Sequence, residues 1–142
     1  MAWETINENV TQQSDLTQQE LEHALREWAR GVYSQMAGVE LLIKHGRAVY
    51  PRAPWIGTDT QGFAWIDCES LITESGAYSG GERRLFAIAA SLIDGLSIRL
   101  NDAVTGLDHA NARLVLDAIA TAAGFAEPTI SFERDPQAPP RS

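Results

Sequence analysis

Residues 78–125 read YSGGERRLFAIAASLIDGLSIRLNDAVTGLDHANARLVLDAIATAAGF, and they contain two helices with clear start and stop signals. The first begins at a capping box, in which the Ser79 hydroxyl can accept from the Glu82 N–H and the Glu82 carboxylate from the Ser79 N–H. Gly95 is expected to end it in the left-handed conformation that other residues avoid. Apolar residues at helical spacing predict that this helix is central in the core; they are Leu85, Phe86, Ile88, Ala89, Leu92 and Ile93. Glu82, Arg83 and Arg84 belong to its polar face.

The second helix is predicted to begin at Asp108 as its N-cap and to stop at Gly124. Its apolar positions are Leu114, Val115, Leu116, Ala118, Ile119 and Ala122. Between the two helices, residues 97–100 can be extended and residues 101–105 can form one turn.

An earlier helix is predicted from a second capping box, formed by Thr17 and Glu20. Apolar side chains then recur at alternating spacings of three and four, so one helix can continue as far as His45. Gly31 and Gly38 each cost ~1 kcal/mol relative to Ala inside a helix, which allows a break or kink near either residue.

Residues 47–61 are predicted to be irregular because two prolines prevent a continuous helix. Short strands are conceivable at residues 48–50 and 63–66, and Asp67 is expected to cap a short helix at residues 68–74. The aromatic side chains of this region either pack onto the helices or form an exposed patch for a partner. In the second case we expect Arg47, Arg52 and Trp55 to make the contacts, since Trp, Tyr and Arg are favoured at interfaces.

The chain ends differ in composition from the middle. Residues 1–25 hold five carboxylates and no Lys or Arg, so residues 1–15 are predicted to be an acidic, partly mobile arm, or a docking segment anchored by Trp3. Residues 16–133 are predicted to form one mainly α-helical domain with short irregular or β segments. Residues 129–132 can form an edge strand, and residues 134–142 are expected to be a disordered, proline-rich tail.

Length and charge limit the classes of function. A chain of 142 residues suits one domain. Its formal net charge of −8 opposes direct binding to nucleic acid or anionic membrane, and it permits a basic protein partner. The single cysteine, Cys68, suggests a reducing cytoplasm, and the sequence has neither a signal-peptide pattern nor a membrane-spanning run.

The run SGGERRLFAIAASLIDG resembles the signature loop and helix of ABC-type ATPases, above all the chromosome-maintenance and DNA-repair branch, which favours SGGE. The following DAVTGLD, beginning at Asp102, is similar to the Walker B and D-loop run DEPTxGLD, less one residue. In that family the signature contacts the γ-phosphate of a nucleotide held by the opposite subunit. The resemblance implies this role for Ser79, Gly80 and Gly81 and a metal-facing role for Asp102. A helix N-terminus suits an anion because it offers free N–H groups.

The chain departs from the ABC pattern in three ways. Ala103 stands where the family has its catalytic Glu, and Arg99 interrupts what should be an apolar Walker B strand. The sequence also lacks the GxxxxGK[ST] loop that cradles a nucleotide's own phosphates. The combination of a capped S-G-E helix and a D-A-x-T-G-L-D run is similar, too, to small uncharacterised proteins of actinobacteria and their phages, which implies no activity.

No catalytic, metal or cofactor set is predicted. His23, His45 and His109 lie far apart in the sequence and are expected on exposed helical faces, and Cys68 lacks a basic neighbour. We therefore expect a small, non-catalytic binding or regulatory protein that docks on a larger protein, and a homodimer is also compatible. One alternative is an ABC-like fragment that contacts nucleotide in trans. Another is an acidic nucleic-acid mimic that inhibits a DNA-binding protein.

Overall fold

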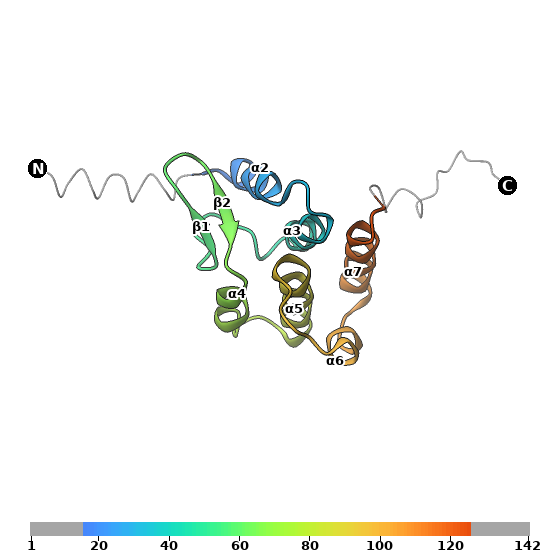
Figure 1. Cartoon of the computed structure of the whole chain (residues 1–142). Helices are drawn as coiled ribbons and strands as arrows, with labels where there is room; N and C mark the ends of the chain where they lie inside the picture. The colour runs from blue at the N-terminus through green and yellow to red at the C-terminus, as the bar shows by residue number, and fades with distance from the viewer. Residues whose placement is uncertain (1–15, 126–142) are drawn as a thin grey trace, which may run out of the picture.

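The computed structural model describes residues 16–125, which form one mainly helical domain (Figure 1). This confirms the predicted fold class. The elements are α2 (Gln18–Ala29), α3 (Tyr33–His45), β1 (Ile56–Thr58), β2 (Ala64–Ile66), α4 (Cys68–Glu74), α5 (Gly80–Asp94), α6 (Leu100–Thr105) and α7 (His109–Ala122). The predicted arm with Trp3, the edge strand at 129–132 and the tail at 134–142 lie outside the described residues.

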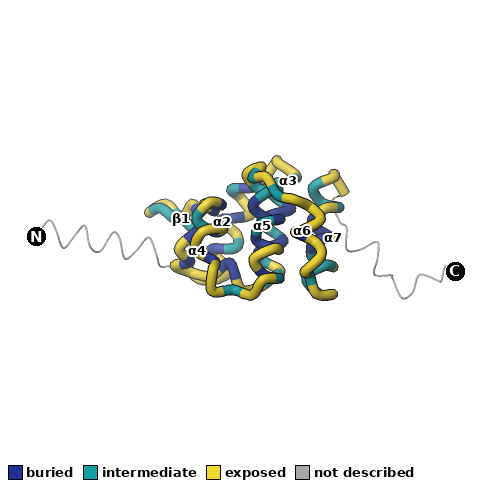
Figure 2. Tube along the Cα trace, turned by 90° about the horizontal axis from the view of Figure 1, so that it is seen from below, coloured by how far each residue is buried: buried dark blue, intermediate teal, exposed yellow. Residues whose placement is uncertain are grey.

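Helix α5 is the central element of the domain. It contacts α3, α4, α6 and α7, and Figure 2 shows its buried residues between the other helices. Leu85, Phe86 and Ala89 are inaccessible to solvent. The capping box of Ser79 and Glu82 is present, and Gly95 ends the helix in the left-handed conformation. The start, the end and the core position of this helix were therefore all predicted correctly.

The predicted helix from residue 17 to His45 is two helices, α2 and α3. The break falls at Gly31, whose φ of 93° is incompatible with a continuing right-handed helix. Arg26 bridges the pair with two hydrogen bonds to Glu40, at 2.6 and 3.2 Å. The apolar spacing continues across the break because both helices bury side chains in the same core, so periodicity alone could not locate the turn.

Gly38 allows α3 and α5 to cross closely. A Cβ at this position would lie 2.5 Å from the Ile93 Cγ1 and 2.9 Å from the Ala89 carbonyl oxygen. Ile93 can move, but the backbone oxygen of a packed helix cannot do so cheaply. The absence of a side chain at Gly38 therefore sets how near the two central helices approach.

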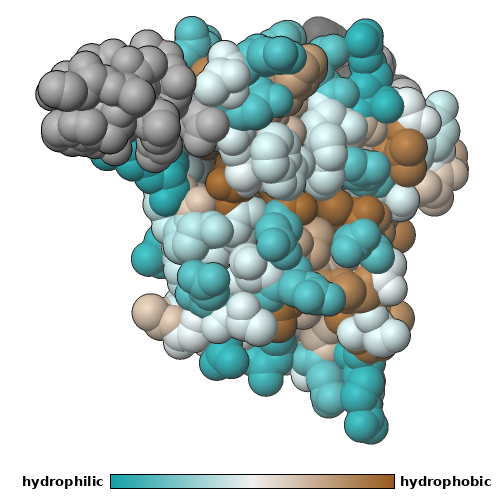
Figure 3. Space-filling model, turned by 60° about the vertical axis from the view of Figure 1, so that its left-hand side comes forward, coloured by the Kyte–Doolittle hydropathy of each residue, from teal (hydrophilic) through white to brown (hydrophobic). Residues whose placement is uncertain are grey.

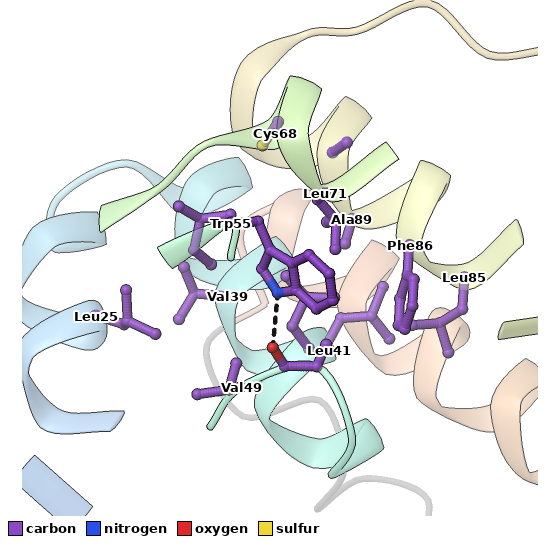
Figure 4. Packing of buried hydrophobic residues seen from close by; sticks show 14 of the residues in the cluster. Leu25, Val39, Leu41, Val49, Trp55, Cys68, Leu71, Leu85, Phe86 and Ala89 are labelled. Atoms are coloured by element: carbon purple, nitrogen blue, oxygen red, sulfur yellow. Dashed lines mark hydrogen bonds between the residues drawn. The ribbon is translucent and has the colours of Figure 1, made fainter. Parts of the chain in front are cut away.

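Trp55 lies at the centre of the core between the irregular segment and the helices (Figure 4). Only 2% of the residue is exposed, and its indole N–H donates to the Ala48 carbonyl at 2.8 Å. Burial of an aromatic ring with its polar atom satisfied is strongly stabilising. The aromatic segment thus folds onto the helices at this residue, and the predicted exposed partner contact at Trp55 is wrong.

The only strands within residues 16–125 are β1 and β2, which pair antiparallel with Ile56 opposite Ile66. The predicted strand at 63–66 is largely confirmed, but residues 48–50 form no strand. Trp65 lies across from Gly57 and packs so close that any Cβ there would overlap its ring.

Helices α4, α6 and α7 follow the predicted start and stop signals in part. Asp67 caps α4, Asp108 caps α7, and Gly124 follows α7 with a φ of 103°. Residues 97–99 are irregular, and Leu100 begins α6, so this stretch contains no strand.

The described surface mixes polar and apolar side chains. On the face shown in Figure 3, hydrophobic side chains form a band between hydrophilic ones. Within residues 16–125, none of the helices combines the length and the apolar character that a membrane crossing needs.

We predict that Gly38→Ala destabilises the protein although Ala favours helix formation by ~1 kcal/mol. The added methyl group meets the Ala89 carbonyl oxygen, and overpacking of this kind costs about 1 to 3 kcal/mol. Urea unfolding followed by circular dichroism measures the change. Gly76→Ala is the control, since a Cβ there meets no atom within 4 Å. A Gly38→Ala protein as stable as the wild type would show that the crossing is looser than described.

Candidate functional site

Glu82 connects the start of α5 to the end of α3. Its carboxylate accepts from the Ser79 N–H at 3.2 Å and lies 2.8 Å from the Arg47 Nη1 and 3.1 Å from the His45 Nε2. The Glu82 side chain is 12% exposed and the His45 side chain 5%. The expectation of an exposed His45 is therefore wrong, because its ring fills the space between Glu82 and Phe86.

The charge of Glu82 is held by its neighbours. Burial alone would raise its pKa, but the hydrogen bond from the Ser79 N–H and the charge of Arg47 outweigh burial and hold the pKa below the ordinary 4.5. Glu82 is therefore ionised at neutral pH, and it offsets the positive charge of Arg47.

Arg47 is exposed but well supported. Its side chain is 67% exposed, yet its guanidinium carbon lies 5.4 Å from the centre of the Tyr78 ring while its Nη1 contacts Glu82. The Tyr78 hydroxyl donates to the Arg47 carbonyl at 3.0 Å. Tyr78 packs edge-on against Phe86 at 5.0 Å and Trp55 at 6.0 Å between ring centres. The core thus fixes the position of a surface cation.

A pocket of about 620 Å³ opens on the opposite face of α5, bounded by α4, α6 and the residues that precede α6. Three arginines line it, namely Arg83 and Arg84 from α5 and Arg99 just before α6. The remaining lining residues are Ile72, Ser75, Gly80, Ala87, Ser97, Ile98, Asp102 and Ala103. Separate parts of the chain therefore combine to form a concave site with basic and apolar walls.

The positive charge of this pocket is only partly compensated. Asp102 is its one acidic lining residue, and its Oδ2 lies 3.5 Å from the Arg99 Nε in an exposed pair. Arg84 donates from its Nε to the uncharged Asp102 carbonyl at 3.0 Å. Its guanidinium rests against Gly106, where any Cβ would overlap it. Among residues 16–125, Arg83 has no ion pair. The pocket can therefore accept an anionic group.

The residues indicated by the ABC resemblance lie near one another. Gly80 and Asp102 line the pocket, while Ser79 caps α5 with its hydroxyl, which accepts from the Glu82 N–H at 3.1 Å. Gly81 lies against α6, since a Cβ there would be 3.1 Å from the Gly106 carbonyl oxygen. Residues 97–99, which align with Walker B, form no strand.

The other predicted residues do not join this site. Trp55 is buried, and Trp3 lies outside the described residues. Arg52 is exposed in the loop after α3, with an unusual positive φ of 71°. His23 and His109 are exposed, and residues 16–125 contain no cluster of side chains suited to hold a metal ion. Burial raises the pKa of the Cys68 thiol to about 12, with the charges of Asp94 and Asp67 adding to the effect.

Sequence reasoning missed the three pocket arginines. Arg83 and Arg84 were interpreted only as part of a polar helix face, and Arg99 only as an interruption of an apolar run. The available signal was two cations directly after a capping box, where the helix dipole favours negative side chains.

Comparison with protein-family models, curated proteins and solved structures found no match to this chain.

We predict that Glu82→Gln lowers the free energy of unfolding at pH 7 by about 1 to 3 kcal/mol. Glutamine can still complete the capping box, so the change isolates the contacts of the carboxylate charge with Arg47 and His45. Because the folded state lowers the pKa of Glu82, its stabilisation is present above about pH 4.5 and is lost as pH falls through the lowered value. Urea unfolding at a series of pH values should show that the difference in free energy of unfolding between the wild type and Glu82→Gln disappears at acidic pH.

Glu20→Gln is the matched control for this experiment, because Glu20 closes the equivalent box of α2 at an exposed position. We expect it to cost less than about 0.5 kcal/mol at pH 7. Equal losses at Glu20 and Glu82 would show that the contacts with Arg47 and His45 contribute nothing.

We predict that the native Cys68 thiol reacts with Ellman's reagent at pH 8 roughly 100-fold more slowly than in urea, because burial excludes the reagent and suppresses the thiolate. Absorbance of the released thionitrobenzoate measures both rates, and glutathione is the reference thiol. Native reaction as fast as that of glutathione would contradict the buried position.

Proposed function

We propose that this chain is a binding protein without catalytic activity of its own, which docks on a larger protein through its arginine end. The arginine end is defined as Arg47, Arg83, Arg84 and Arg99. The observation that carries the proposal is that Arg83, Arg84 and Arg99 line one pocket at the start of α5, with Arg47 on the other face of the same turn, in a chain with a formal net charge of −8. The buried free thiol of Cys68 suits a reducing compartment, so we propose that this occurs in the cytoplasm.

The placement of Arg83 and Arg84 supports a binding role. They are the fourth and fifth residues of α5, near an end where the helix dipole makes a cation unfavourable by a few tenths of a kcal/mol. Helix stability therefore does not account for arginine at these positions. Local rules are most often broken at functional sites.

The support that two of these arginines receive also favours recognition. Arg47 is held by Glu82 and Tyr78, and Arg84 by the Asp102 carbonyl and the backbone of Gly106. A side chain that is already ordered loses less conformational entropy when it binds. Guanidinium groups also pair with carboxylates through two parallel hydrogen bonds, which explains their frequency at interface hot spots.

Charge asymmetry can orient the partner. The arginine end attracts an acidic patch, while the acidic remainder of the chain repels it, so the two proteins are steered toward one orientation. The net charge of −8 still opposes nonspecific attraction to nucleic acid or anionic membrane.

We predict that Arg83→Ser/Arg99→Ser loses a specific partner that the wild-type protein retains. Two charge-assisted contacts are removed, and the loss of one such contact already weakens binding by about tenfold or more. The measurement is affinity capture from an extract of the source cells at physiological salt, quantified by mass spectrometry.

The control is Arg30→Ser/Arg113→Ser, which changes the net charge equally at the C-cap of α2 and within α7, outside the arginine end. Thermal melts must show that both variants are folded. A partner that binds wild type and control equally but not the first variant supports the proposal. Capture that is unaffected by Arg83→Ser/Arg99→Ser, or no reproducible capture at any concentration, contradicts it.

A nucleotide contacted in trans is the second candidate function. The observation in its favour is that Gly80 and Asp102 line the same pocket as three arginines. Titration with fluorescent ATP, alone and with the captured partner, separates it from the first proposal. A response that requires Arg83 and Arg84 would favour the nucleotide, and no response in either setting would remove it.

A further inference from the structure

We infer that the pocket of the arginine end holds an acidic segment of the partner protein, with a carboxylate on the arginines and an adjacent aliphatic side chain against the apolar wall. This inference rests on the proposed function and names the chemistry that the site recognises. Its basis is a pocket in which uncompensated guanidinium groups and aliphatic side chains occur together.

The cationic part of the pocket is Arg83 and Arg84. Arg83 has no ion pair among residues 16–125, and the described contact of Arg84 is to a neutral carbonyl. That bond uses only the Nε of Arg84, so both of its Nη groups keep donors for another acceptor. A carboxylate satisfies two such donors at once, which is the geometry that guanidinium favours.

The apolar part consists of Ile72, Ala87, Ile98 and Ala103. Ile72 is 39% exposed, which leaves a large aliphatic group at the surface of α4. The volume of about 620 Å³ falls within the range typical of ligand sites. A ligand that presents charge alone would leave the aliphatic wall in water, whereas a charged residue beside Leu or Ile would cover it.

The charge of Glu82 argues against a phosphate as the preferred ligand. Phosphate sites at helix starts use free N–H groups and the positive end of the dipole. Here the Glu82 carboxylate already accepts from the Ser79 N–H and is ionised at neutral pH. A second, doubly charged group at the same turn would be repelled. An acidic side chain held farther along α5, at Arg83 and Arg84, avoids much of that repulsion.

The experiment selects 12-residue peptides from a random display library on the wild-type full-length chain. Selection against Arg83→Ser/Arg84→Ser removes peptides that bind elsewhere. The enriched peptide is then measured by fluorescence polarisation against both proteins, with Arg30→Ser/Arg113→Ser as the charge control. We expect a motif in which Asp or Glu adjoins Leu, Ile or Val, and at least about tenfold weaker binding to Arg83→Ser/Arg84→Ser.

A second variant tests the pocket without altering its charge. Ala87→Leu places a larger side chain on the α5 wall of the pocket and leaves all three arginines in place. It should weaken the same peptide at least fivefold while thermal melting shows a folded protein. Unchanged affinity in this variant would mean that the peptide binds the arginines outside the pocket, which overturns the inference.

Competition identifies the ligand class. Inorganic phosphate or ATP that displaces the peptide at equal or lower concentration overturns the carboxylate assignment in favour of a phosphate ligand. A synthetic peptide of residues 1–15, which carries Glu4, Glu8 and Asp15 and has Trp3 next to Glu4, tests the chain's own N-terminus. If it binds more tightly than the selected peptides, the occupant is this segment rather than a partner.

Failure of this inference can be distinguished from failure of the proposed function. If capture depends on Arg83 and Arg99 but no acidic–aliphatic motif is enriched, the docking proposal stands and the ligand class is wrong. If an acidic–aliphatic peptide binds the pocket but no cellular partner depends on it, the recognition chemistry stands and the docking proposal fails.

Discussion

The carboxylate of Glu82 determines how the start of α5 is built. It completes the capping box, contacts Arg47 and His45 from the α3 side, and keeps a negative charge at the positive end of the helix dipole. Without this carboxylate, the positive charge of Arg47 and the positive end of the α5 dipole would repel each other next to the aromatic rings of the core. Four arginines can lie around this turn because the buried carboxylate of Glu82 offsets the exposed Arg47, and Asp102 offsets Arg99 at the surface.

The two opposite faces of α5 therefore differ in role: one packs against α3, and the other lines the pocket. On the α3 side, Gly38 lets the helices approach closely and Glu82 secures the contact, so this face is rigid and largely buried. On the other side, Arg83 and Arg84 border a pocket whose charge is not matched within the described residues. A rigid face fixes the position of the helix, and this position in turn fixes the arginines.

The sequence predicted most of the fold because its helices are bounded by local signals. Thr17, Asp67, Ser79 and Asp108 each accept the hydrogen bond expected of an N-cap, and these bonds depend only on neighbours three residues away. Gly31 was one of the two predicted break positions, but the sequence could not choose between it and Gly38, because a glycine allows a turn without requiring one. The site was harder to predict: Arg99 joins Arg83 in the pocket because residues 97–99, between α5 and α6, line it, and Trp55 is buried in a core shared with distant helices, where its ring contacts Tyr78. Such long-range contacts leave no periodicity in the sequence.

The resemblance to an ATPase signature does not require phosphate chemistry to explain these residues. Ser79 and Glu82 satisfy each other's backbone groups, Gly81 permits close approach of the Gly106 carbonyl, and residues 97–99 have no strand to present Asp102. Ser79, Gly81 and Glu82 thus each have a structural reason within one chain. Arg83 and Arg84 are the exception, since the capping box does not need them and the helix dipole opposes them. An anionic ligand at this turn therefore meets the least resistance when it approaches from the side of α4 and α6, where the guanidinium groups lie and the Glu82 carboxylate is turned away toward α3.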